Sequence, residues 1–100
     1  MIPLSPDTQT LVARLFPPTD QAAIIRALEE HCIGIARHNP TPQTLERTRF
    51  AVLKLSQGDR NTFDRALALE QRDFRDVLMG AGFGSDLQAH RKWFAKQVEL

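Results

Sequence analysis

The stretch TPQTLERTRFAVLKLSQG, residues 41–58, decides the fold of this chain. Its large apolar residues are Leu45, Phe50, Val52, Leu53 and Leu55. At the period of an α-helix they cover more than half of the circumference. A helix that is apolar over so wide an arc is usually central, with neighbours on several sides. We therefore predict a central helix over residues 42–57, which begins after Thr41 and is closed by Gly58.

Four other segments carry apolar residues at the same helical period. They predict helices over residues 6–16, 20–38, 61–81 and 86–98. No segment alternates in the manner of a strand, and no internal repeat is visible. The expected fold class is therefore all-α: a compact bundle of about five helices, forming a single domain over residues 1–100.

The segment over residues 61–81 leaves one alternative open. Its apolar residues form an unbroken stripe at spacings of three and four, which favours one long helix. The alternative is a break near Arg72, with Asp73 as a new N-cap. The N-cap of the whole segment is Asn61 or, two residues earlier, Asp59.

The helix expected over residues 20–38 contains a glycine. Its apolar period continues past Gly34, so we predict an interior glycine at a close contact between helices. The helix end is expected at residues 37–40, where Arg, His and Asn precede a proline.

The glycine-rich stretch GAGFGSD, residues 80–86, resembles a phosphate-binding loop at first sight. Dinucleotide-binding loops follow a strand and have the spacing G-x-G-x-x-G, whereas here a helix precedes glycines spaced G-x-G-x-G. Asp86 would also repel a phosphate at the start of the following helix. The stretch is therefore interpreted as a joint between two helices, and no cofactor is expected.

The joint has specific expected contacts. Gly82 would adopt the left-handed conformation that ends a helix, and Phe83 would fold back against Leu78. Ser85 would start the last helix in a capping box with the glutamine three positions later. Gly80, inside the last turn, indicates a neighbour that crosses close to it.

Composition narrows the possible functions. The hydrophobic fraction of 42% and the charged fraction of 25% are ordinary for a globular protein. The formal net charge is +1, and residues 1–40 and 41–100 are both nearly balanced. This balance argues against nucleic-acid and membrane partners. The single cysteine, Cys32, fits a reducing compartment, so we expect a cytoplasmic protein.

Neither a metal site nor a catalytic site is expected. His31 and His38 are seven residues apart, too far for adjacent ligation, and Cys32 lies on a core stripe. The serines sit at helix caps, and no Ser/His/Asp grouping or close carboxylate pair follows from the spacing. The sequence therefore favours a protein that is not an enzyme.

Two sets of candidate contact residues remain. The leading hypothesis is a non-catalytic protein that works through protein–protein contact, either with a protein partner or as a homodimer. The alternative is a small helix-turn-helix-like DNA-binding regulator that uses its last helix. The candidate partner-binding residues are Arg72, Asp73, Arg75, Asp76 and Trp93. The candidate DNA-contacting residues are Arg91, Lys92 and Lys96.

Two runs of sequence carry a resemblance to known proteins. The run over residues 46–59, with LKLSQGD at its end, and the later RDFRDVL at residues 72–78 resemble small uncharacterised bacterial helical proteins. Those proteins pair an LKLSxGD-like helix end with an RDYRDVL-like helix. The resemblance spans about residues 46–83, with Phe74 in place of the usual Tyr. It implies a bacterial cytosolic helical protein and carries no activity.

Overall fold

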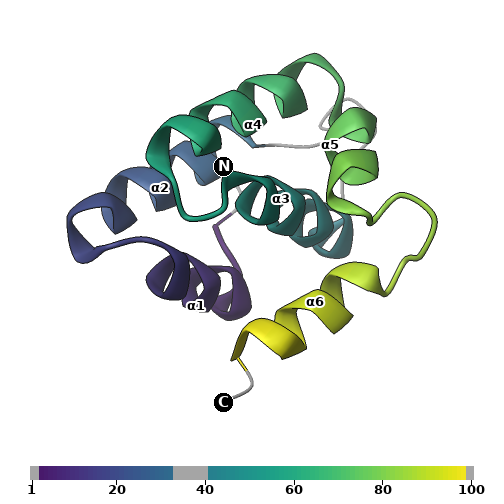
Figure 1. The fold of residues 1–100 in the computed structure, drawn as a ribbon, viewed down its shortest axis with the longest axis horizontal. Coiled ribbons are helices and arrows are strands. Elements are labelled where there is room, and N and C mark those ends of the chain that lie inside the picture. Colours follow the sequence, from purple (N-terminus) through teal and green to yellow (C-terminus); the bar gives the residue numbers. More distant parts are fainter. Residues whose placement is uncertain (1–2, 33–40, 99–100) are drawn as a thin grey trace.

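A computed structural model describes residues 3–32 and 41–98, which are helical and contain no strand (Figure 1). The helices are α1 (Pro6–Leu15), α2 (Pro18–His31), α3 (Pro42–Ser56), α4 (Arg60–Arg72), α5 (Phe74–Ala81) and α6 (Ala89–Val98). Helix α3 runs through the middle and contacts α1, α4, α5 and α6. Its residues 50–53 are fully buried, which confirms the predicted central helix.

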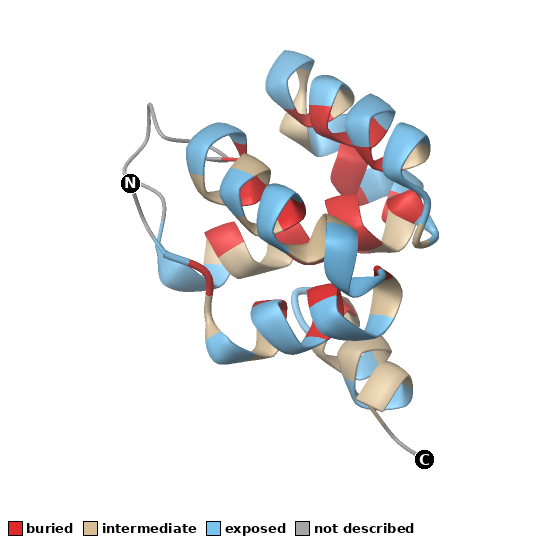
Figure 2. Cartoon of the chain, turned by 90° about the vertical axis from the view of Figure 1, so that its left-hand side faces the viewer, coloured by how far each residue is buried: buried red, intermediate tan, exposed pale blue. Residues whose placement is uncertain are grey.

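The buried residues face inward from every side. Figure 2 shows them on the faces that the helices turn toward one another, with exposed residues on the outer faces. They form one hydrophobic core with contributions from each helix or its flanking residues. The all-α fold class is confirmed, although the described part has one helix more than the five expected. No helix in the described ranges is long and apolar enough to cross a membrane.

Helices α1, α3 and α4 begin at side-chain caps. The Ser5 hydroxyl accepts a hydrogen bond from the Thr8 backbone at 3.2 Å, and Thr41 caps α3 in the same way at 3.1 Å. Asp59 caps α4 by accepting the Thr62 amide at 2.8 Å, so the earlier of the two predicted caps is used. Each cap satisfies an amide that has no partner within the helix.

The single helix predicted over residues 61–81 is wrong. The helix is interrupted at Asp73, whose backbone is extended, with a φ of −158° and a ψ of 102°. The Asp73 carboxylate accepts the Arg75 amide at 3.0 Å and starts α5 as a new N-cap. The apolar phase survives the break because α4 and α5 both pack against α3. A continuous stripe therefore does not prove a continuous helix.

The boundaries of the second and last helices also differ from the prediction. Helix α2 begins at Pro18 and ends at His31, because Cys32 takes a non-helical conformation and accepts a hydrogen bond from Arg49 Nε at 3.3 Å. The predictions for Gly34 and for a helix end at residues 37–40 lie outside the described residues. Helix α6 begins at Ala89 and not at residue 86.

The start of α6 is set by an aspartate. The Asp86 carboxylate accepts the Gln88 amide at 2.8 Å, so Asp86 fills the place that the sequence assigned to Ser85. The pKa of Asp86 is lowered, mainly by this amide, next by Lys92 and least by Arg47. Because residues 87–88 form a turn before the helix, Leu87 points outward and is 70% exposed.

The turn predicted at Gly82 is confirmed. Gly82 has a φ of 80°, and the Phe83 amide donates to the Leu78 carbonyl at 2.8 Å, as in a Schellman motif. Phe83 is fully buried beside α6. The close crossing predicted at Gly80 is wrong, because its nearest neighbours are the Leu55 methyl groups at 3.7 Å from where a Cβ would lie.

A polar cluster lies inside the core. Arg49 is 2% exposed and donates to the backbone carbonyls of Cys32 and Pro3. Burial lowers the pKa of Arg49, whereas Cys32, Glu29 and Glu70 raise it. Burial raises the pKa of the Cys32 thiol well above its usual value, which keeps the thiol neutral. Glu70 is also buried and interacts with this arginine, which offsets the cost of burying its carboxylate.

Candidate functional site

The residues predicted to bind a partner lie at two separate places. Arg72, Asp73, Arg75 and Asp76 surround the junction between α4 and α5, whereas Trp93 lies on α6 beyond the other end of α5 (Figure 1). Asp73 is committed to capping α5 and to an ion pair with Arg75 at 3.4 Å. Arg72 and Asp76 are exposed. They are four residues apart, a spacing that brings side chains together on one helix, but they lie on two different helices.

Trp93 belongs to an aromatic cluster. Its ring centroid lies 6.1 Å from that of Phe50 and 6.0 Å from that of Phe83. Phe94 stacks on Phe50 at 5.5 Å, and His90 meets the same ring edge-on at 5.5 Å. Trp93 is therefore half-buried and holds α6 on the body of the protein.

The residues predicted to contact DNA are mostly engaged with carboxylates. Arg91 pairs with Asp7 at 2.9 Å, and Lys92 pairs with Asp86 at 3.0 Å. Lys96 is exposed. Carboxylates therefore pair with two of the three cations that the sequence assigns to DNA contact.

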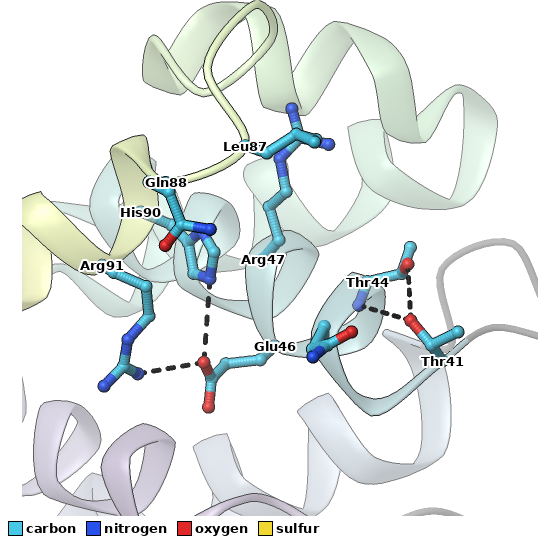
Figure 3. Close-up of a pocket in the computed structure, with 9 residues that line it drawn as sticks. Thr41, Thr44, Glu46, Arg47, Leu87, Gln88, His90 and Arg91 are labelled. Carbon is cyan, nitrogen blue, oxygen red and sulfur yellow. Dashed lines mark hydrogen bonds and ion pairs between the residues drawn. The ribbon is translucent and has the colours of Figure 1, made fainter.

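A cleft near these residues lies between α3 and the start of α6. Its volume is about 540 Å³. Figure 3 shows its side chains converging from the two helices, with Glu46 and His90 between them. The lining residues are Thr41, Gln43, Thr44, Glu46, Arg47, Leu87, Gln88, His90 and Arg91.

Glu46 is the point at which three elements meet. One carboxylate oxygen accepts from Arg91 of α6 at 3.0 Å, and the other accepts from the Ser5 hydroxyl at 2.9 Å. Arg91 in turn bonds Asp7 of α1. Burial alone would lower the pKa of Arg91, but the two carboxylates raise it above its usual value. Glu46 thus ties α6 to α3 and to the cap of α1.

His90 lies beneath this ion pair. It is 6% exposed, and its Nε2 is 3.7 Å from the Glu46 carboxylate. Its Nδ1 is buried without a hydrogen bond of normal geometry. The Leu87 backbone has only a weak effect on the pKa of His90. Burial lowers the pKa of His90, Glu46 opposes this, and Arg91 and Arg47 add to the lowering.

The lowered pKa of His90 predicts a pH-dependent stability. Because the unfolded chain takes up this proton more readily, the stabilisation is complete above pH 6.5 and decreases as the pH falls below it. Urea unfolding of the wild type on either side of pH 6.5 should show this decrease, and His90→Gln should remove it. His31→Gln, at an exposed histidine, is the control and should keep it. An equal decrease in the His90 variant would contradict the prediction.

Arg47 differs from the other cations around the cleft. Its Nη2 donates to the backbone carbonyls of Phe83 and Gly84, which follow α5. Its Nε is buried without a hydrogen bond, and none of the described carboxylates pairs with it. Asp86 interacts with it weakly, but that carboxylate is bonded to Lys92 and to the Gln88 amide. Arg47 is thus a fixed guanidinium that no carboxylate within the described ranges neutralises.

Two exposed apolar side chains flank the joint between α5 and α6 along the chain. Met79 and Leu87 are each 70% exposed, and they are the large hydrophobic residues most open to solvent in the described part of the chain. Met79 lies at the end of α5 and Leu87 just before α6, on either side of the joint over residues 82–86. Leu87 also lines the cleft.

The sequence pointed to part of this site. Arg91 is a candidate DNA contact in the sequence, whereas nothing in the sequence marks Glu46, Arg47 or Leu87 as residues of a site. Glu46 and Arg47 lie on the polar arc of the central helix and carry no local signal. Their contacts span more than 35 residues along the chain. Such pairings follow from the packing of α6 against α3 and not from any local pattern.

No relative assigns a role to the cleft. Comparisons of the chain with protein-family models, with curated proteins and with solved structures found no match. Within residues 3–32 and 41–98, no group of three or more His, Cys, Asp or Glu side chains could hold a metal ion. The interpretation of the site therefore depends on its own geometry.

Proposed function

We propose that the protein is a non-catalytic helical protein that works by binding another protein chain, either a second copy or a different partner. The surface that we assign to this role comprises Met79, Leu87, Gln88 and Arg47 at the joint between α5 and α6. We call it the joint surface. The exposure of Met79 and Leu87 on either side of one short connection is the observation that supports it.

The composition of the joint surface supports this proposal. Single exposed hydrophobic residues are normal on soluble proteins, but here two flank one connection, and one of them borders a cleft. Interfaces combine apolar anchors with a polar rim that satisfies hydrogen bonds. Leu87 supplies such an anchor beside the exposed amide of Gln88 and the guanidinium of Arg47. The half-buried Trp93 is less suited to anchoring a partner.

Affinity capture tests the proposal. The tagged wild type and a Met79→Ser/Leu87→Ser variant are expressed beside the untagged chain in the cells that make this protein. Quantitative mass spectrometry then compares what each captures. We expect at least one protein, or the untagged copy, to be depleted by about tenfold or more with the variant.

The control is an Ala13→Ser variant, at an exposed position on α1, which should capture the same set as the wild type. Thermal unfolding must show that the double variant remains folded, as expected for two exposed positions. Identical captured sets for the wild type and the double variant would contradict the proposal.

A further inference from the structure

The strongest unused feature of the joint surface is the guanidinium of Arg47. Its Nη2 is anchored by the carbonyls of Phe83 and Gly84, which fix where the side chain lies. Its remaining donors have no bond within the described ranges, and the buried Nε is among them. Arg47 as a whole is half-buried and lines the cleft, so its guanidinium offers positive charge and hydrogen-bond donors to a group that enters there.

The cations around the cleft differ in whether a carboxylate pairs with them. Arg91 is shared between Asp7 and Glu46, and Lys92 is paired with Asp86. Arg47 alone among these cations is held by neutral carbonyl groups. An arginine fork matches the geometry of a carboxylate and binds it through charge-assisted hydrogen bonds.

The neighbours of Arg47 suggest what carries this carboxylate. Leu87 offers exposed apolar surface, and two exposed glutamines, Gln43 on α3 and Gln88 just before α6, also line the cleft. Side-chain amides can both donate to and accept from a peptide backbone. These groups together fit a peptide segment that carries an acidic residue next to an apolar one.

We propose that the joint surface recognises an acidic segment of its protein partner, with a Glu or Asp carboxylate bound by Arg47 and an adjacent apolar side chain against Leu87. This inference rests on the proposed function and names the chemistry of the partner. A second role of Arg47, holding the joint through the two carbonyls, is compatible with it. The test must therefore separate recognition from structural support.

Fluorescence anisotropy with two labelled peptides makes this separation. The first is a short blocked peptide in which glutamates flank a leucine, and the second has glutamine in place of every glutamate. The wild type should bind the glutamate peptide about tenfold more tightly, and added salt should weaken this preference. Arg47→Gln should abolish the preference. Lys96→Gln removes the same charge from an exposed site on α6 and should preserve it.

The Arg47→Gln substitution also removes the hydrogen bonds that hold the joint. A measurement on the wild type therefore tests recognition without this substitution. The NMR signal of the Arg47 Nε–H group should shift on titration with the glutamate peptide and not with the glutamine peptide. Equal affinity for the two peptides, or no binding of either, overturns the inference. If both peptides bind equally and Leu87→Ser weakens both, the joint surface binds chains without recognising acid, so the proposed function stands while the inference fails.

Discussion

Replacing Phe50 with alanine is expected to lower the free energy of unfolding by about 3–5 kcal/mol. The ring is fully buried on the central helix and contacts His90, Trp93 and Phe94 of α6. Its removal leaves a cavity beneath α6 and takes away the surface on which that helix packs. A loss of this size is a large part of the total stability of a small domain, which is about 5–15 kcal/mol.

Urea unfolding at neutral pH measures the loss. The fluorescence of Trp93, the single tryptophan, reports separately on the packing of α6 and should shift toward that of an exposed indole. Phe74→Ala is the matched control, because this ring is only partly buried at the start of α5. Phe74→Ala should lower the free energy of unfolding by less than Phe50→Ala does and should leave the emission wavelength of Trp93 unchanged. Equal losses for the two variants would contradict the central position of Phe50.

Substituting Gly58 with alanine is expected to destabilise the protein strongly. Gly58 has a φ of 76°, a region that costs an L-residue about 1–2 kcal/mol. A Cβ at this position would also lie 2.7 Å from the backbone carbonyl oxygen of Leu15, at the end of α1. Because a backbone atom cannot give way cheaply, the junction between α1 and the end of α3 must shift, which adds to the cost.

Gly80→Ala provides the opposite expectation. A Cβ there meets only the Leu55 methyl groups at 3.7 Å, an ordinary contact, and alanine is favoured over glycine in a helix by about 1 kcal/mol. Thermal unfolding should therefore show a lower Tm for Gly58→Ala and an equal or higher Tm for Gly80→Ala. The account of both glycines is wrong if the two variants change Tm in the same direction.

The sequence predicted those parts of the fold that depend on short-range patterns. The wide apolar arc of α3 predicted a central helix, and Thr41 predicted where that helix starts. The left-handed Gly82 followed from the residues on either side of it. Each of these features is decided within one or two turns of helix, where spacing and capping chemistry act directly.

The prediction failed where distant packing decides. The apolar stripe over residues 61–81 keeps its phase, yet Asp73 supplies a cap that lets the chain turn so that both halves pack on α3. The close approach assigned to Gly80 belongs to Gly58, since it depends on where α1 ends relative to α3. Neither outcome can be read from local periodicity.

The candidate site was harder to predict for the same reason. Arg47 meets the joint only because α5 and α6 fold around α3, and Glu46 meets Arg91 from 45 residues away. Arg72 and Asp76 are four residues apart, but the helix on which that spacing would bring them together is broken between them. The residues at the α4–α5 junction remain candidates for partner contact, in competition with the joint surface.

Site-specific photocrosslinking tests most directly whether the joint surface is where a partner binds. A photoreactive amino acid is placed at Leu87 in one variant and at Arg75, an exposed residue near the start of α5, in another. Both variants are irradiated in the cells that make the protein. We predict a discrete crosslinked product from position 87, formed with a partner or a second copy, and none from position 75. A product from position 75 without one from position 87 would contradict the joint surface and return the contact to the α4–α5 junction.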